Sequence, residues 1–226
     1  MPVSRIAGLL FDLDGTLLDS APDLVGSLNW VRAGEGLPPL EVAAMSRFAS
    51  RGAAGLLKAG MPVADAEQFD AWKQKFLTHY TDNSYVHSNL YPDIPELLEY
   101  LSSVGIPWGI VTNKVQALTL PILQSAGLLH QAACVVCGDT LSRSKPDPAP
   151  VLHACQIIRI EPSSALFAGD DVRDLQAGYS AGTMTAAVYY GYGSHELNDD
   201  KYSASFRVSA PGEFIQLVKA HNDIGA

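Results

Sequence analysis

The stretch Phe11-Asp12-Leu13-Asp14-Gly15-Thr16 joins the apolar run Ile6–Phe11 to a pair of acidic residues. We interpret the run as a buried β-strand, in which residues i and i+2 point to the same side. Asp12 and Asp14 then lie side by side at the carboxyl end of this strand. Two such carboxylates share a proton or bind a hard divalent cation such as Mg²⁺. A turn or helix-capping role stays equally open from the spacing alone.

Short apolar runs, each followed by a turn and a helical pattern, recur along the rest of the chain. The predicted strands after the first are 107–111, 134–137, 165–168 and 183–188, and the helices between and after them are 94–104, 115–126, 149–157, 172–181 and 211–220, the last preceded by a polar loop at 191–205. This alternation is typical of an α/β fold with a doubly wound, Rossmann-like parallel sheet. Ligands of such folds bind beyond the carboxyl ends of the strands.

The alternation is interrupted after the first strand, where apolar residues recur at helical spacing only. The helices predicted there are 23–32, 42–57 and 64–80. We therefore predict a discontinuous core domain, residues 1–18 and 88–226, with an inserted all-helical cap domain, residues 19–87. We interpret the aromatic residues of the last cap helix as packing between cap helices; they are Phe69, Trp72, Phe76 and Tyr80.

Polar residues follow the other predicted strands as well. Thr112-Asn113-Lys114 offers a hydroxyl and backbone N–H groups that suit an anion, although by itself the segment is better explained as an ordinary helix cap. Lys145 lies between stiffening prolines in Ser144-Lys145-Pro146-Asp147-Pro148, which places its side chain. The segment 169–174, Gly-Asp-Asp-Val-Arg-Asp, adds three carboxylates. Acids, a hydroxyl and a lysine thus meet at one edge of the predicted sheet.

These four groups, in this order, resemble the four motifs of the haloacid dehalogenase superfamily. The matching positions are Asp-x-Asp-Gly-Thr at 12–16, Thr112, Lys145 and Gly-Asp-x-x-x-Asp at 169–174. The resemblance covers the whole predicted core. It implies a Mg²⁺-dependent phosphatase that works through an aspartyl-phosphate and carries a helical cap over its site.

The acidic residues take distinct roles in this resemblance. Asp12 would be the nucleophile, and Asp14 would act as general acid and then as general base. Mg²⁺ would be held by Asp12, the backbone carbonyl of Asp14 and Asp170. Asp174 would support the lysine or the metal-bound water. Asp171 stands where many relatives have Ser, and we favour a helix-capping role for it.

The remaining positions would bind the substrate. Thr112 and Lys145 would hold and neutralise the phosphate oxygens, with Thr16 and Asn113 as further substrate-binding residues. In the cap, we consider Arg47, Arg51 and Lys58 as partners for a substrate carboxylate. We favour Arg51, which precedes a glycine. Taken singly, each of these cations is better explained as a solvated surface residue.

Within the superfamily, residues 108–114, 142–148 and 169–192 look most like phosphoglycolate phosphatases and N-acetylmuramic acid 6-phosphate phosphatases, and more like the second. The implied substrate is a small carboxylated phosphate monoester of one of these two kinds. Dehalogenases lack a second acid in the first motif, so Asp14 argues against that activity. A sugar phosphomutase shares both acids and the cap and stays an alternative. A catalytically silent binding protein on this fold is a further alternative.

Composition limits the remaining classes. The chain has 226 residues, 47% of them hydrophobic, with 15 Lys and Arg against 24 Asp and Glu and a net charge of −9. We therefore expect a globular protein that does not bind nucleic acid, since such binding requires clustered cations. No apolar run reaches the roughly 18 residues of a membrane span. Oligomeric state stays open.

The chain has three cysteines, which cannot all be paired and are too few for a disulfide scaffold. We therefore expect reduced thiols and a cytoplasmic protein. Cys134 and Cys137 form a Cys-x-x-Cys pattern inside a predicted strand. Residues three apart on a strand face opposite sides, so we expect no zinc or redox site there.

Overall fold

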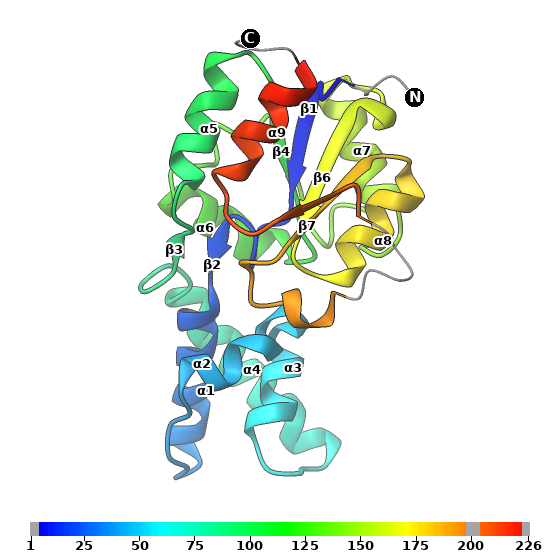
Figure 1. Ribbon diagram of the computed structural model, residues 1–226. Helices are drawn as coiled ribbons and strands as arrows, with labels where there is room; N and C mark the ends of the chain where they lie inside the picture. The colour runs from blue at the N-terminus through cyan, green and yellow to red at the C-terminus, as the bar shows by residue number, and fades with distance from the viewer. Residues whose placement is uncertain (1–4, 198–203, 223–226) are drawn as a thin grey trace.

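A six-stranded parallel sheet forms the centre of the computed structural model, which describes residues 5–197 and 204–222 (Figure 1). The strand order is β5-β4-β1-β6-β7-β8. The strands are β1 (Gly8–Phe11), β4 (Trp108–Val111), β5 (Cys134–Val136), β6 (Ala165–Gly169), β7 (Met184–Val188) and β8 (Phe206–Val208). The first five lie where the sequence predicts them. The sequence does not predict β8, because three residues after a polar segment are too few to show alternation.

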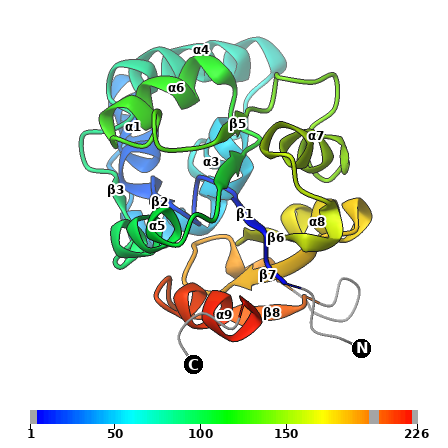
Figure 2. The same cartoon turned by 90° about the horizontal axis from the view of Figure 1, so that it is seen from above.

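Helices cover both faces of this sheet, as Figure 2 shows from above. On one face α5, α6 and α9 share a buried cluster with Leu9 and Phe11 of β1, and on the other face α7 and α8 share a cluster with Leu10. The helices are α5 (Ile94–Ser103), α6 (Gln116–Ser125), α7 (Ala149–Ile158), α8 (Val172–Ala181) and α9 (Glu213–Asn222), with short 3-10 helices η2 (Pro162–Ser164) and η3 (Ser194–Glu196). The doubly wound α/β fold is therefore confirmed. Of the predicted loop 191–205, residues 198–203 lie outside the described residues.

The inserted segment is helical and lies beyond the carboxyl end of β1 (Figure 1). Its helices are α1 (Ala21–Gly34), α2 (Val42–Met45), the 3-10 helix η1 (Ser46–Arg51), α3 (Gly52–Gly60) and α4 (Ala66–Asp82). The single helix predicted over 42–57 is wrong, because the backbone of Gly52 has φ +63° and breaks it. No helix among the described residues is long and apolar enough to span a membrane.

Two short strands mark the junction between this cap and the core. β2 (Leu18–Asp19) and β3 (Asn89–Leu90) pair antiparallel where the chain leaves and re-enters the core. Asp23, in the first turn of α1, is buried and accepts hydrogen bonds from the N–H groups of Val86, His87 and Ser88, each at 2.9 Å. A buried carboxylate with this many donors pins the returning segment against α1. The sequence analysis missed this residue, because its partners are more than 60 positions away.

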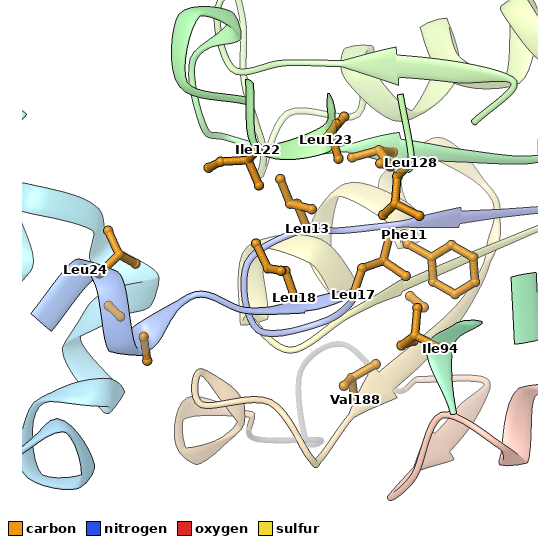
Figure 3. Packing of buried hydrophobic residues seen from close by; sticks show 14 of the residues in the cluster. Phe11, Leu13, Leu17, Leu18, Leu24, Ile94, Ile122, Leu123, Leu128 and Val188 are labelled. Atoms are coloured by element: carbon orange, nitrogen blue, oxygen red, sulfur yellow. The ribbon is translucent and has the colours of Figure 1, made fainter. Parts of the chain in front are cut away.

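The loop after β1 is packed tightly around leucine side chains (Figure 3). Leu13 and Leu17 are fully buried, and the N–H groups of Leu17 and Leu18 both donate to the carbonyl of Leu13, at 3.0 and 2.9 Å. The N–H of Asp12 donates to the carbonyl of Ala168 in β6 at 2.9 Å. The loop that carries both acids of the first motif is therefore held by the core beneath it.

The three cysteines lie in the sheet, just beyond it, and in a helix that covers it. Cys134, Cys137 and Cys155 are all free thiols and all buried. Burial raises the pKa of Cys134 and of Cys155 to about 11 and also raises the pKa of Cys137. Cys155 lies in α7 and shares a buried cluster with Cys134 of β5, and Cys137 lies beyond the end of β5. Among the described residues, the one group of possible metal-binding side chains contains no cysteine.

We predict that these thiols are unreactive in the native protein at about pH 8, because the thiolate is the nucleophile. Ellman's reagent should label all three only after unfolding. Since burial favours the neutral thiol, the free energy of unfolding should fall as the pH rises from the ordinary thiol pKa of 9.0 towards 11. Rapid labelling of the folded protein would contradict this account.

Candidate active site

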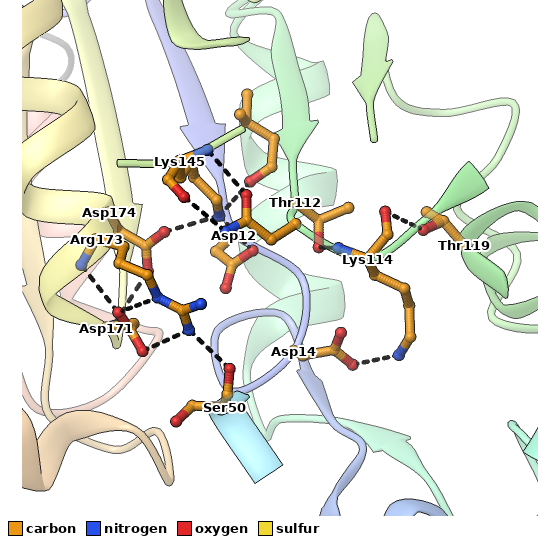
Figure 4. A network of polar contacts seen from close by, with 12 residues as sticks. Asp12, Asp14, Ser50, Thr112, Lys114, Thr119, Lys145, Asp171, Arg173 and Asp174 are labelled. Atoms are coloured by element: carbon orange, nitrogen blue, oxygen red, sulfur yellow. Dashed lines mark hydrogen bonds and ion pairs between the residues drawn. The ribbon is translucent and has the colours of Figure 1, made fainter. Parts of the chain in front are cut away.

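Lys145 lies at the centre of a buried charge network at the carboxyl edge of the sheet (Figure 4). Its Nζ is 2.7 Å from Asp12 Oδ1, from Asp174 Oδ1 and from the carbonyl oxygen of Val111. Burial alone lowers the pKa of Lys145, but the two carboxylates outweigh it and raise that pKa above its usual value. The ammonium group is therefore charged and fixes the orientation of Asp12.

Asn113 positions the loop that carries this lysine. Its Nδ2 donates to the carbonyl of Lys145 at 2.8 Å, and its Oδ1 accepts from the N–H of Lys145 at 2.9 Å. Asn113 also lines the cavity beside Asp12, so the substrate-binding role expected for it stays a prediction, alongside this structural one. The side chain holds the ends of β4 and of the Lys145 loop together.

Asp14 lies in a different environment from Asp12. Its Oδ1 accepts hydrogen bonds from Ser20 Oγ at 2.5 Å and from Lys114 Nζ at 2.7 Å. Lys114 also donates to the hydroxyl of Tyr80 in cap helix α4, at 2.9 Å. Burial alone would lower the pKa of Lys114, but its contacts with the Asp14 carboxylate and the Tyr80 hydroxyl outweigh this effect and raise that pKa. Asp14 thus contacts both the cap junction and, through Lys114, the cap itself.

Sequence reasoning missed these contacts of Lys114 and Tyr80. Lys114 directly follows Thr112 and Asn113 in the second motif, and its place at a strand end was the available signal. Tyr80 is buried in the aromatic stripe, as predicted, but its hydroxyl also reaches the site. The side chain of Tyr80 therefore both packs in the cap and contacts Lys114 of the site.

Asp170 offers an unsatisfied carboxylate oxygen. It is 1% exposed, and its Oδ2 accepts from the N–H of Gly193 at 2.7 Å, but its Oδ1 is buried without a hydrogen-bond partner among the described residues. Ligand oxygens of Asp12, Asp170 and Asp174 lie within 4.8 Å of one another. Burial, followed by the charges of Asp12 and Asp174, raises the pKa of Asp170 well above its usual value. These oxygens suit a hard divalent cation.

The close approach of loops to Asp170 depends on glycines. Gly15 has φ +87°, and a Cβ there would collide with the Asp170 carboxylate. Gly191 and Gly193 also leave no room for a Cβ beside Asp170. The segment after β7 therefore closes the site from the side opposite β4, a role that the sequence analysis did not assign.

The two threonines expected at the site are placed differently. Thr112 is buried, lines the cavity and accepts a hydrogen bond from the N–H of Lys114 at 3.1 Å, which leaves its own proton for a ligand. Thr16 is fully buried and is not among the residues that line the cavity. Its carbonyl instead accepts from the hydroxyl of Tyr190 at 2.9 Å. The hydroxyl of Thr16 is buried without a hydrogen-bond partner among the described residues, and the substrate-binding role expected for it stays a prediction.

Asp171 caps helix α8, as expected. Its Oδ1 accepts from the N–H of Arg173 at 2.9 Å, and the Asp174 side chain accepts from the N–H of Asp171 at 3.1 Å, which completes a capping box. Asp174 therefore supports both the helix and Lys145. Hydrogen bonds and the charge of Arg173 outweigh burial and lower the pKa of Asp171.

A cavity of about 470 Å³ lies between this edge of the sheet and the cap. Asp12, Asp14 and Lys145 line it, and so does Arg51. The other cap cations considered, Arg47 and Lys58, are exposed and do not line it. Two further cations that the sequence analysis missed line this cavity; they are Lys73 and Arg173.

Known proteins are similar to this chain along its length. The family model for haloacid dehalogenase-like hydrolases matches residues 9–188. The N-acetylmuramic acid 6-phosphate phosphatase of Pseudomonas aeruginosa is 41% identical over 95% of each chain. The phosphoglycolate phosphatase of Xylella fastidiosa is 36% identical over 93% of this chain and 95% of its own. A crystal structure of a predicted phosphoglycolate phosphatase from Haemophilus somnus has a TM-score of 0.82 and 29% identity, and it covers 94% of this chain and 97% of its own.

In buffer without divalent cations, we predict that Asp170→Asn raises the thermal unfolding midpoint. The substitution keeps the shape and the acceptor for Gly193 but removes a buried charge, so the gain should be about 1 kcal/mol. Differential scanning calorimetry at about pH 8 measures it. Glu99→Gln, at an exposed site on α5, is the matched control and should change little. A lower midpoint for Asp170→Asn would show that this carboxylate is not under repulsion.

Proposed function

Because the chain belongs to the haloacid dehalogenase-like hydrolases, we propose that it is a Mg²⁺-dependent phosphatase that acts through an aspartyl-phosphate on Asp12. It is a hydrolase of phosphate monoesters, as are its relatives at 41% and 36% identity. The physiological substrate that we propose is N-acetylmuramic acid 6-phosphate. The observation that carries the mechanism is the pair of acids at the end of β1, where Lys145 binds Asp12 and where Lys114 and Ser20 bind Asp14.

The first half-reaction uses both acids. A carboxylate oxygen of Asp12 attacks phosphorus, and the bond from phosphorus to the ester oxygen breaks. Asp14, in its protonated form, gives its proton to the departing alkoxide. Lys145 holds the nucleophile in place, and the free hydroxyl proton of Thr112 is available to a phosphate oxygen. The product at this stage is the phosphorylated Asp12 and the free alcohol.

The second half-reaction returns the enzyme to its starting state. Asp14, now a carboxylate, takes a proton from a water molecule as the water attacks phosphorus. The acyl-phosphate bond breaks, and inorganic phosphate leaves with Asp12 restored as a carboxylate. One acid thus serves in both halves, because its proton is lost in the first and recovered in the second.

Three groups would hold Mg²⁺ in this site: a free oxygen of Asp12, the unpartnered Oδ1 of Asp170 and the backbone carbonyl of Asp14. When bound, the ion offsets the repulsion between carboxylate and phosphate and stabilises charge on the transferred group. The buried, unpaired oxygen of Asp170 supports this assignment, since such an atom is expensive to leave without a partner.

The cavity supports a sugar acid as the substrate. Its volume of about 470 Å³ falls in the range of roughly 300–1,000 Å³ that is usual for sites of sizeable ligands. Apolar side chains from both the cap and α6 line it, and they suit the ring and the acetyl methyl group; these are Leu24, Phe76, Leu77 and Leu118. The relative named for N-acetylmuramic acid 6-phosphate also has the higher identity of the two described above.

A second candidate substrate is 2-phosphoglycolate, which the relative from Xylella fastidiosa is named for. It also carries a carboxylate and a phosphate, but it has only two carbons and would leave most of the cavity to water. A sugar phosphomutase shares both acids with this chain and would retain the phosphoryl group. Release of inorganic phosphate separates hydrolysis from that alternative and from silent binding.

The direct test is phosphate release from N-acetylmuramic acid 6-phosphate and from 2-phosphoglycolate, compared as kcat/KM. We predict a preference of at least about a hundredfold for the sugar acid. EDTA should abolish release, and Asp12→Asn should reduce kcat to background. Preference for 2-phosphoglycolate would overturn the proposed substrate, and full activity of Asp12→Asn would overturn the proposed nucleophile.

The contacts of Asp14 predict a dependence on the leaving group. Lys114→Met removes the cation that orients Asp14, so kcat/KM, which reports the steps up to the first phosphoryl transfer, should fall about tenfold or more on an alkyl phosphate, whose alkoxide needs a proton. On p-nitrophenyl phosphate, whose leaving group needs no proton, the fall should be under about threefold. Lys219→Met, at an exposed site on α9, is the control. Equal losses on both esters would show that Lys114 does not act through the general acid.

A further inference from the structure

Arg173 connects the core to the cap at one side of the cavity (Figure 4). It lies in the first turn of α8, and its Nη2 donates to the carbonyl of Ser50 in η1 at 2.7 Å. Asp171 holds the guanidinium from behind with both oxygens, at 2.8 Å from Nε and 2.8 Å from Nη2. The side chain is 36% exposed. Its position is therefore fixed before any ligand enters.

Two polar groups at this seam have no partner. Nε and Nη2 of Arg173 are bonded as described, but Nη1 has no hydrogen-bond partner among the described residues. Ser50 Oγ is buried, and it also lacks a partner within the described part of the chain. Both residues line the same cavity as Asp12. A buried hydroxyl without a partner is unfavourable, so a ligand that accepts a hydrogen bond here would be stabilised.

The chemistry of this seam suits an anion. The guanidinium of Arg173, with its unbonded Nη1, and the neighbouring hydroxyl of Ser50 both provide hydrogen-bond donors. The carboxylate of Asp171 is engaged with Arg173 and with the N–H of the same residue. Arg51, the residue after Ser50, lines the cavity and adds a second positive charge.

We propose that Arg173 and Ser50 form the subsite for the carboxylate of the substrate, at the seam between core and cap. This inference rests on the proposed function, because it assumes a phosphate monoester that also carries a carboxylate. The phosphate is placed by Thr112 and Lys145 beside Asp12, and the carboxylate binds at Arg173. A substrate held at both places contacts η1 of the cap and α8 of the core, so its carboxylate adds to the contact that Arg173 already makes between them.

A contact of Arg173 with the phosphate itself is the competing arrangement. It is disfavoured because Asp171 fixes the guanidinium against Ser50 of the cap, whereas Thr112 has a free hydroxyl proton next to the nucleophile and Lys145 adds a positive charge there. The two arrangements differ in a measurable way. A phosphate contact is used by every phosphate monoester, whereas a carboxylate contact is used only by esters that have one.

The experiment compares substrates with and without the carboxylate group. N-acetylmuramic acid 6-phosphate is paired with N-acetylglucosamine 6-phosphate, which lacks the lactyl ether, and 2-phosphoglycolate is paired with 2-hydroxyethyl phosphate. Arg173→Gln should lower kcat/KM for the carboxylated member by about ten- to a hundredfold and change that of its partner by less than about threefold. Ser50→Ala removes only the hydroxyl and should lower the same ratio about threefold or more.

Arg159→Gln, the same change at an exposed site after α7, is the control for Arg173 and should leave both ratios unchanged. Equal losses on both members of each pair would overturn the inference in favour of a phosphate or structural role. Unchanged ratios in Arg173→Gln would also overturn it, while the substrate preference of the unmodified protein, measured in the same assay, would still support the proposed function. A protein that prefers neither carboxylated ester over its partner would overturn the subsite and the proposed substrate class together.

Discussion

The buried ammonium group of Lys145 holds the site together. Asp12, Asp170 and Asp174 converge at the carboxyl edge of the sheet, where their charges would repel one another in a medium of low polarity. Lys145 bridges two of them, and its loop is in turn fixed by the amide of Asn113. The third, Asp170, keeps an unpaired oxygen. This charge arrangement explains how an acidic protein can bind and cleave an anionic ester.

The cap is connected to this charge network from both sides of the cavity. Lys114 bonds to Tyr80 of α4 and to Asp14, and Arg173 bonds to Ser50 of η1 and to Asp171. Each cap contact is thus one residue away from an acid at the carboxyl edge of the sheet. Of these two contacts, the one through Lys114 reaches Asp14, the proposed general acid, and the one through Arg173 reaches Asp171, which caps α8.

Much of this could be predicted from sequence, because the decisive signals are local. Because side chains alternate along a strand, the run that ends at Phe11 predicted Asp12 and Asp14 on the same side of the chain, at the carboxyl edge of the sheet. The alternation of strands and helices predicted the sheet itself. The rest depends on contacts between distant segments. Nothing near Lys114 or Arg173 in the sequence indicates their partners in the cap, which lie 34 and 123 positions away. The break at Gly52 was missed because apolar spacing continues through it.

The central claim is that Asp12 becomes phosphorylated during turnover. Acid quenching during steady-state hydrolysis, followed by borohydride reduction, converts an acyl phosphate on aspartate to homoserine, and peptide mass spectrometry locates it. The account predicts homoserine at position 12 alone, and none in protein quenched without substrate. Homoserine at Asp14 or Asp170, or none at any position while phosphate is being released, would contradict it.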